Sequence, residues 1–321
     1  MRMVNTAMGP VPADQLGETM IHEHICCADW SMRMNLGTQF FSFDTVVTQA
    51  VRCLKAAKEA GVDTICDGTP INLGRDIRLI RAVAERVPVH IIPSSGFYHQ
   101  EEPWLAFQDP ERVYAWLHHE TQHGIAGTGI KPGIMKAATE HLGITPTMTK
   151  TLTAVGRAAA EVDLPIFCHH AVGDGTGPKL VELFASCGVA PERVTIGHCS
   201  DSNDMAYLHE VLATGCYIGM DRLAYYATRN SLENIAKNIA KLIEDGYQDR
   251  ILLGHDWGTY FGWWEDWETF REDFVYQRNP KVSQESYALI NKTFVPILEA
   301  AGVEKLVINE MLRENPKRFF A

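Results

Sequence analysis

The sequence lacks the segments that would place a protein in or across a membrane. No stretch of its 321 residues approaches the ~18 consecutive apolar residues of a membrane span. The opening stretch MRMVNTAMGPVPADQLGE contains no continuous apolar run, so it does not have the form of a secretory signal peptide. These absences argue against a membrane partner and predict a cytoplasmic protein.

Paired cysteines and several binding or nucleophile signatures are also missing. None of the 8 cysteines belongs to a CxxC pair, so we expect reduced, mostly buried thiols and no cysteine-rich zinc site. No GxGxxG opens the first strand–helix unit, GTGIKPG lacks the GK[ST] ending of a P-loop, and no GxSxG occurs. Acidic residues outnumber basic ones by 40 to 29, which gives a net charge of −11 and argues against nucleic acid as a partner.

Short apolar segments alternate with amphipathic ones along most of the chain. The predicted strands cover residues 19–22, 62–66, 89–92, 129–137, 164–169, 194–198, 216–220 and 251–254. The predicted helices cover residues 43–60, 75–86, 110–124, 147–162, 178–187, 204–214, 231–245, 283–301 and 304–315. This alternation predicts a parallel sheet, and eight units without a linker predict a single-domain (β/α)₈ (TIM) barrel over residues 1–321. A doubly wound open sheet is the alternative.

Histidines and one carboxylate follow several of the predicted strands. In ETMIHEHICC, His22 and His24 flank Glu23, and side chains two residues apart in a strand point to the same side, as a chelating pair requires. Later strand ends carry further candidates: Lys136, His169-His170, His198 and His255-Asp256. Each histidine taken singly is more often a structural polar residue. In a barrel, however, all these ends share one rim, and their joint occurrence there favours a metal site.

These features resemble the amidohydrolase superfamily and, within it, the phosphotriesterase family with its phosphotriesterase-like lactonases. The motifs that carry the resemblance occur in order along nearly the whole chain: GPVPADQLGETMIHEH, IMKAATEHLGITP, LPIFCHHAVGDGTG, APERVTIGHCSDSND, ILLGHDW and INEMLRENPKRFF. The resemblance implies a hydrolase with a binuclear metal centre.

The resemblance also implies which side chains bind the two divalent ions: His22, His24, Lys136, His169, His198 and Asp256. The first two histidines and the aspartate would bind the more buried ion, the later two histidines the more exposed one, and the lysine would bridge both as a carbamate. Neutral imidazoles and carboxylates suit zinc, which is the expected metal. Lys131 is the rival bridge, but it lies five residues from Lys136, so a regular strand would point the two oppositely. Glu23 would point away from the metals and serve a structural role.

The expected reaction is hydrolysis of a lactone or carboxylic ester, with the metal-bridging hydroxide as nucleophile and Asp256 as the catalytic proton acceptor. A dedicated phosphotriesterase is the alternative enzyme. The sequence also allows a barrel that binds metal without catalysis and an aldolase-type barrel that uses Lys136 as a Schiff base.

Substrate-binding residues are predicted from the loops that follow three strands. Tyr98 in SGFYHQ and Arg222, directly after Asp221, resemble pocket residues of the lactonases; simple packing and a surface ion pair are the respective alternatives. After the eighth strand, an aromatic loop could wall an apolar pocket or cover the barrel end: Trp257, Tyr260, Phe261, Trp263 and Trp264. Trp267 and Phe270 could instead form a dimer contact. Related barrels are often dimers, which allows a homodimer, although the sequence leaves the oligomeric state open.

Overall fold

The computed structural model describes residues 2–262 and 285–321. The predictions made for Trp263, Trp264, Trp267 and Phe270, and for the start of the helix at 283–301, lie outside these described residues. Within the two described ranges, no helix combines the length and the apolar character that a membrane crossing requires.

A parallel sheet forms the centre of the fold. A short antiparallel hairpin, β1 (Met3–Thr6) and β2 (Gly9–Pro12), precedes it. The sheet strands are β3 (Thr19–Cys27), β4 (Thr64–Asp67), β5 (His90–Gly96), β6 (Ile134–Ala138), β7 (Ile166–His169), β8 (Val194–Ile196), β9 (Tyr217–Met220), β10 (Ile251–Leu253) and β11 (Trp257–Phe261). They pair in the spatial order β10-β9-β8-β7-β6-β5-β4-β3-β11, and every pairing is parallel.

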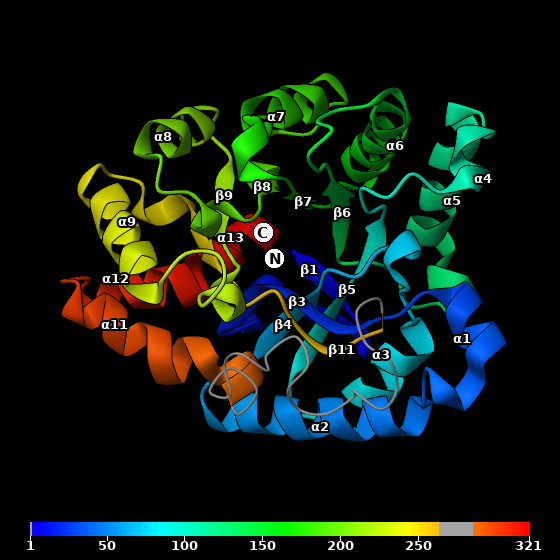
Figure 1. Ribbon diagram of the computed structural model, residues 1–321, viewed down its shortest axis with the longest axis horizontal. Coiled ribbons are helices and arrows are strands. Elements are labelled where there is room, and N and C mark those ends of the chain that lie inside the picture. Colours follow the sequence, from blue (N-terminus) through cyan, green and yellow to red (C-terminus); the bar gives the residue numbers. More distant parts are fainter. Residues whose placement is uncertain (1, 263–284) are drawn as a thin grey trace.

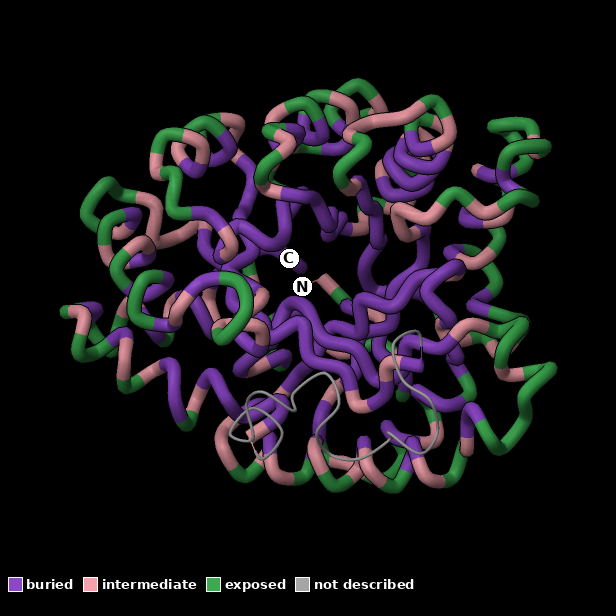
Figure 2. The backbone as a smooth tube through the Cα atoms, in the orientation of Figure 1, coloured by how far each residue is buried: buried purple, intermediate pink, exposed green. Residues whose placement is uncertain are grey.

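Helices surround the strands on the outside (Figure 1). They are α1 (Trp30–Leu36), α2 (Phe43–Glu59), α3 (Ile77–Ala84), α4 (Pro103–Ala106), α5 (Pro110–His123), α6 (Pro146–Val162), α7 (Gly177–Ser186), α8 (Met205–Ala213), α9 (Leu232–Glu244), α11 (Val295–Ala300), α12 (Lys305–Asn309) and α13 (Asn315–Phe320). Burial is concentrated at the central strands, whereas the outward sides of the helices are exposed (Figure 2). The strand–helix alternation predicted from the sequence is therefore confirmed.

The sheet is curled, so that its inner face forms a core of its own. Seven strands each contribute one buried side chain to this core: Ile21, Cys66, Ile92, Ile134, Phe167, Tyr217 and Leu252. Val4 of the hairpin and Phe319 and Phe320 of α13 belong to the same cluster, and both chain ends lie at the centre of the view in Figure 1. The two edge strands of the sheet, β10 and β11, are separated in the chain by only residues 254–256. Between them, the Asp256 N–H donates to the His22 carbonyl at 2.9 Å, which joins the two ends of the curl.

Local signals explain why most elements begin where they do. The predicted cap at Thr145-Pro146 is confirmed, because Thr145 Oγ1 accepts from the Met148 N–H at 3.1 Å and Pro146 opens α6. All nine residues of β3 are buried, as expected for a parallel strand covered on both faces. That covering also explains why β3 extends five residues beyond the predicted end at His22.

Several predicted boundaries are wrong. The strand predicted from residue 129 begins at Ile134, because Gly129 has a left-handed φ of 77° and Pro132 has no N–H to donate to a ladder. The segment after the eighth predicted strand is not simply an aromatic loop, since residues 257–261 form β11 and pair with β3. The hairpin β1–β2 and the helix α1 were not predicted. The eight cysteines are free thiols, and six of them are buried, as predicted.

Candidate metal centre

The six side chains that the resemblance names as metal ligands meet at the carboxyl ends of the strands, and all six are buried: His22, His24, Lys136, His169, His198 and Asp256. On β3, His22 Nε2 lies 2.7 Å from Lys136 Nζ, which projects from β6. Asp256 Oδ1 lies 3.1 Å from His24 Nε2 and 3.6 Å from His22 Nε2. The alternation of side chains in a strand therefore directs both β3 histidines to one point.

The remaining two histidines form a second contact close to the first. His169 Nδ1, at the end of β7, lies 2.6 Å from His198 Nε2. His198, two residues after the end of β8, adopts a left-handed φ of 65°. The rings of His198 and His22 have centroids 5.3 Å apart. The two groups of candidate ligands are thus neighbours in one buried cluster.

Hydrogen bonds on the outer side of the cluster fix two imidazole tautomers. His22 Nδ1–H donates to Asp221 Oδ2 at 2.7 Å, and His169 Nε2–H donates to Glu140 Oε2 at 2.9 Å. Because a carboxylate can only accept, the opposite ring nitrogen of each histidine carries a lone pair that points into the cluster. A carboxylate behind a ligand histidine is the usual arrangement at metal sites.

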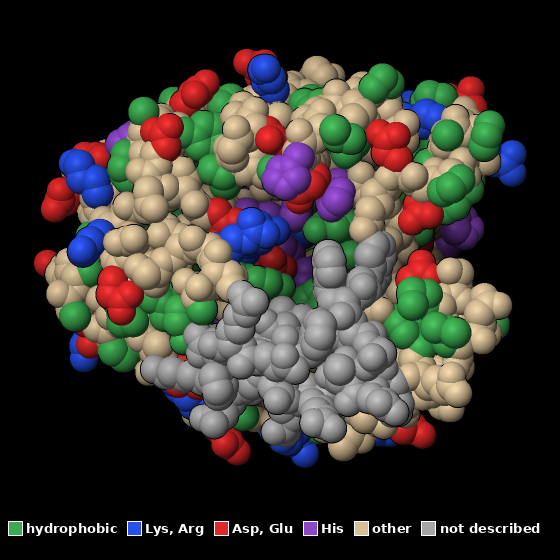
Figure 3. Space-filling view, in the orientation of Figure 1, with side chains coloured by type: hydrophobic (Ala, Val, Ile, Leu, Met, Phe, Trp, Pro, Cys, Tyr) green, Lys and Arg blue, Asp and Glu red, His purple; other side chains and the backbone are tan. Residues whose placement is uncertain are grey.

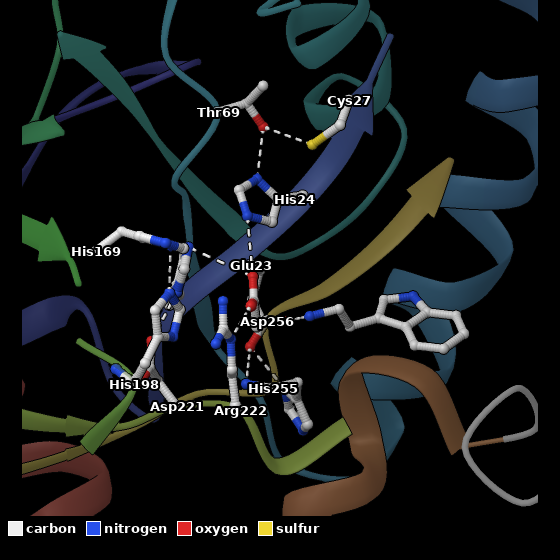
Figure 4. A network of polar contacts seen from close by, with 12 residues as sticks. Glu23, His24, Cys27, Thr69, His169, His198, Asp221, Arg222, His255 and Asp256 are labelled. Atoms are coloured by element: carbon white, nitrogen blue, oxygen red, sulfur yellow. Dashed lines mark hydrogen bonds and ion pairs between the residues drawn. The ribbon is translucent and has the colours of Figure 1, made fainter. Parts of the chain in front are cut away.

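Two further contacts complete this outer shell. His24 Nδ1 lies 2.8 Å from Thr69 Oγ1, which also lies 3.9 Å from Cys27 Sγ (Figure 4). His198 receives less support: its backbone N–H donates to Asp221 Oδ1 at 2.5 Å, while its buried Nδ1 lies 3.3 Å from Asp221 Oδ2 without a hydrogen bond. Hydrogen bonds therefore hold the imidazoles mainly through the ring nitrogens that face away from the cluster.

The donor set fits a pair of bound cations. His22 Nε2 lies 2.7 Å from Lys136 Nζ and 3.6 Å from a carboxylate oxygen of Asp256. His169 Nδ1, which carries a lone pair, lies 2.6 Å from His198 Nε2, so that the His198 Nε2–H can donate to it. Neutral imidazole nitrogens and carboxylate oxygens are electron-pair donors, so their convergence in one buried space suits a cation. Histidine and aspartate are the ligands that zinc and similar divalent ions take.

Burial keeps three imidazoles of this cluster neutral, those of His22, His169 and His198, and lowers the pKa of Lys136. Desolvation is the main cause that lowers the pKa of His169 to about 3, and it also holds the pKa of His22 and His198 well below the usual value. Desolvation likewise lowers the pKa of Lys136 to about 8, although nearby carboxylates oppose this effect. Neutral imidazoles are the form that binds a metal, and an amine with a lowered pKa has a larger unprotonated fraction.

Neighbouring residues that the sequence left as alternatives have other roles. Lys131 is exposed and lies beside the β1–β2 turn, so of the two candidate lysines only Lys136 reaches the cluster. His170 Nδ1 donates to the Gly197 carbonyl at 2.6 Å, while its Nε2 contacts the Tyr207 hydroxyl. In the pairs at 169–170 and 255–256, one residue of each therefore faces the cluster.

Glu23 and His255 form a buried support beneath Asp256. Glu23 Oε1 accepts from the His255 N–H at 2.9 Å and from its Nδ1–H at 2.6 Å, while Oε2 accepts from the Trp257 N–H at 3.2 Å. Asp256 lies between these two anchored amides with a left-handed φ of 54°, a conformation that is uncommon outside glycine and must be held by its surroundings. Figure 4 shows Glu23 and His255 against Asp256.

The Glu23→Ala variant should be markedly less stable than the natural protein. It leaves three buried donors without an acceptor, each worth about 1–3 kcal/mol, so the free energy of unfolding should fall by several kcal/mol. Urea denaturation of the metal-free protein measures this loss. Glu23→Gln is the matched control, because it keeps the shape and one acceptor oxygen and should lose less. Equal stability of Glu23→Ala and the natural protein would contradict a supporting role.

A cavity of about 550 Å³ opens above the cluster, with His24 and Asp256 among its lining residues. Its walls are partly apolar, formed by Leu73, Tyr225 and Phe261. Figure 3 shows the hollow at the centre of this face, with histidine and charged side chains gathered around it.

Two of the three predicted substrate-binding residues line this cavity. Tyr98 does so with its ring centroid 5.0 Å from that of His169. Arg222 does so while its Nε donates to Asp256 Oδ2 at 3.2 Å and its Nη1 to Asp201 Oδ2 at 2.8 Å. Arg222 is therefore largely buried and forms ion pairs with two carboxylates, so the alternative of a surface ion pair is wrong.

The predicted aromatic wall is only partly present among the described residues. Trp257 is buried, and its ring packs against that of Tyr287 at 6.4 Å instead of facing the cavity. Tyr260 packs against Phe40 and donates its hydroxyl to the Phe40 carbonyl. Phe261 lines the cavity. Because residues 257–261 form a strand, the neighbouring side chains of Tyr260 and Phe261 point to opposite faces.

Sequence reasoning missed the residues that orient the ligands. Asp221 follows β9 directly, so a buried carboxylate at a strand end was the available signal, but the residue was noted only as a neighbour of Arg222. Thr69 and Glu140 follow β4 and β6 by two residues each. Polar residues are common after strands, and only the fold shows that these two contact His24 and His169.

Comparisons with known proteins agree with the geometry. The sequence pattern of the phosphotriesterase family matches residues 2–320. A "phosphotriesterase homology protein" of Mycobacterium tuberculosis is 34% identical over 99% of this chain and 97% of its own length. An "aryldialkylphosphatase" of Saccharolobus solfataricus is 29% identical over 100% of both chains, and a "phospho-furanose lactonase" of Mycoplasmopsis synoviae is 26% identical over 100% of this chain and 92% of its own length.

A solved structure supports the same relationship. The structure of the phosphotriesterase from Mycobacterium tuberculosis superposes with a TM-score of 0.90 at 33% identity, and the match covers 99% of this chain and 98% of that one. Members of the phosphotriesterase family are metal-dependent hydrolases with a binuclear divalent metal centre, which agrees with the buried histidine–aspartate cluster. The chain belongs to the phosphotriesterase family.

Proposed function

We propose that this protein hydrolyses lactones or carboxylic esters at a binuclear metal centre. The observation that carries the proposal is the meeting of six buried ligand side chains beneath a partly apolar cavity that Tyr98 and Arg222 also line. Zinc is the proposed metal, because imidazole nitrogens dominate the ligand set. We also propose that β10 and β11 act together as an interrupted eighth strand of a (β/α)₈ barrel.

His22, His24 and Asp256 would hold the more buried ion, and His169 and His198 the more exposed one. Lys136 would bridge the two as a carbamate, since its Nζ lies inside the ligand cluster and an ammonium group cannot bind a cation. A pair of divalent ions in this position supplies an activated water and polarises the oxygen of the scissile bond.

The protein's own groups would then handle the proton and the substrate. Asp256 Oδ1 faces the ligand cluster and would accept the proton of the attacking water, while Arg222 holds Oδ2 of the same carboxylate at 3.2 Å. The Tyr98 hydroxyl would orient the ester oxygen or the leaving group. Phe261, Leu73 and Tyr225 would bind the apolar part of the substrate and exclude water.

A dedicated phosphotriesterase remains the second candidate, and the relatives support both: one is named an aryldialkylphosphatase and another a phospho-furanose lactonase. Two features favour the lactone or carboxylic ester. Arg222 occupies the position after Asp221 that resembles the lactonases, and Tyr98 stands beside His169. Because family membership does not fix the substrate, only rates can decide.

Comparative kinetics should show kcat/KM for lactones or aryl esters at least about tenfold above that for phosphotriesters, a difference of about 1.4 kcal/mol in transition-state binding. The three substrate classes are assayed on one metal-loaded sample whose metal content is measured. The opposite ranking would establish the phosphotriesterase alternative. No turnover of any class with two ions bound would favour the non-catalytic barrel. Trapping of a substrate on Lys136 by borohydride would instead favour the Schiff-base mechanism.

The single-domain organisation, the cytoplasmic location and a homodimer stay predictions.

A further inference from the structure

Three histidines surround the side chain of Glu140 at the rim of the cavity. His169 Nε2 and His99 Nε2 lie 2.9 and 3.9 Å from Glu140 Oε2, and His141 Nε2 lies 3.3 Å from Oε1. The ligand atoms of His99, Glu140 and His169 all lie within 4.8 Å of one another. The role of Glu140 in orienting His169 accounts for one of these imidazoles and leaves the other two unexplained.

We propose that His99, Glu140 and His141 form a third divalent-cation site, separate from the binuclear centre, whose occupancy inhibits the enzyme. Two imidazoles and a carboxylate are a typical ligand set for zinc. With bonds of about 2.0–2.1 Å, ligand atoms around a tetrahedral zinc lie about 3.3 Å apart. His141 Nε2 lies 3.3 Å from Oε1 of Glu140 and His99 Nε2 lies 3.9 Å from Oε2, so each histidine faces one oxygen of the carboxylate. Water would complete the coordination.

The site can be reached from solvent without opening the fold. The side chains of His99 and Glu140 are 23% and 25% exposed, and that of His141 is 82% exposed, so its ring can turn toward the other two. The loop that carries Glu140 and His141 is closed by the Gly143 N–H, which donates to the Glu140 carbonyl at 2.7 Å. The ligands therefore come from two segments, the one after β5 and the loop after β6.

Two arginines lie near this site, but carboxylates offset part of the repulsion that they would exert on a cation. Arg222 and Arg229 line the same cavity. Arg222 is neutralised by Asp201 and Asp256, at 2.8 and 3.2 Å, and Arg229 Nη1 lies 4.0 Å from Asp201. Glu140 is thus the carboxylate on this wall that no arginine or lysine engages among the described ion pairs.

Occupancy should inhibit for two reasons. A cation bound to Glu140 competes with the hydrogen bond from His169 Nε2, which orients a ligand of the binuclear centre. It also narrows the cavity, because His99, Glu140 and His141 all line it. The inhibition rests on the proposed function, whereas binding of the third ion does not.

Equilibrium dialysis against Zn²⁺, with metal analysis, tests the binding. The natural chain should take up a third, weaker equivalent beyond the first two, and the His99→Ala/His141→Ala double variant should take up two. The matched control is His118→Ala/His209→Ala, which removes two other histidines that also contact carboxylates, Glu161 and Asp245; it should keep the third equivalent. Absence of a third equivalent in the natural chain, or its retention in the His99/His141 variant, would overturn the proposal.

Turnover with and without excess Zn²⁺ tests the inhibition, with each variant compared only with itself. The ratio of turnover with excess Zn²⁺ to turnover without it should lie below one in the natural chain and in the control. It should stay near one in the His99→Ala/His141→Ala variant. Binding of a third ion with an unchanged ratio would overturn the inhibitory role. If the proposed binuclear centre is wrong, the first two equivalents will be missing in every variant, while an equivalent that depends on His99 and His141 remains measurable.

Discussion

Asp256→Asn should lower kcat by about 10²–10⁴-fold, the usual contribution of a positioned general base, while both metal ions stay bound. The amide oxygen of asparagine can still occupy the place of Oδ1, which lies 3.1 Å from His24 Nε2. It cannot accept the proton of the attacking water. Steady-state kinetics and metal analysis of the same preparation measure the two effects separately.

A control variant tests whether a lost contact of Asp256, rather than the loss of the base, lowers kcat. Arg222 Nε donates to Asp256 Oδ2 at 3.2 Å, and the side-chain amide of asparagine can turn its NH₂ toward the guanidinium and weaken that contact. Arg222→Lys keeps the positive charge, loses the fork of donors and leaves the carboxylate intact, so it should lower kcat much less than Asp256→Asn. Near-normal kcat in Asp256→Asn with two ions bound would disprove the role of Asp256 as the base.

Removal of the metal ions should abolish turnover completely. Among the described residues the candidate centre offers no serine nucleophile, and the proposed activation of water depends on the bound cations. Prolonged dialysis against a chelator followed by assay gives the result, and added Zn²⁺ with bicarbonate should restore activity. Incubation with a zinc-saturated chelator is the control for unspecific damage.

A variant of Lys136 tests the proposed carbamate bridge in the same metal-removal experiment. Lys136→Met keeps much of the apolar stem that lies against Phe167, over whose ring the Lys136 Nζ lies at 4.4 Å. It cannot form a carbamate, so neither Zn²⁺ nor bicarbonate should restore turnover to that variant. Full activity of a metal-free sample would refute the binuclear mechanism, and full recovery of Lys136→Met would refute the carbamate.

The parallel α/β fold could be predicted because its signals are local. Buried parallel strands need continuous apolar segments, and the amphipathic helices between them carry caps such as Thr145-Pro146. The same local reasoning failed where tertiary pairing decides. Residues 257–261 became β11 because β3 extends to Cys27 and offers a free edge, and that edge is not visible in the sequence of either segment.

The candidate ligands could be predicted because they occupy strand ends. In a parallel sheet those ends share one edge, so position in the chain grouped the candidates, while the resemblance to the phosphotriesterase family chose His169 and Asp256 from the adjacent pairs at 169–170 and 255–256. Trp257 shows the limit of this reasoning. It follows Asp256 directly, yet its ring packs against Tyr287, whereas Phe261, four residues later, lines the cavity.

By itself, the sequence determined the alternation of strands and helices and the residue types that end the strands, because both follow from residues a few positions apart. It also determined the acidic charge, because the net charge follows from composition. Only the tertiary structure decided which nitrogen of His22, His24 and His169 faces the cluster, since their partners Asp221, Thr69 and Glu140 follow other strands. The folded chain likewise brought Glu23 to the backbone amides on either side of Asp256. These amides belong to His255 and Trp257, which lie 232 and 234 residues from Glu23 in the sequence. Hydrogen bonds of this kind depend on distances of a few ångströms between segments far apart in the chain, and no local pattern of residues encodes such distances.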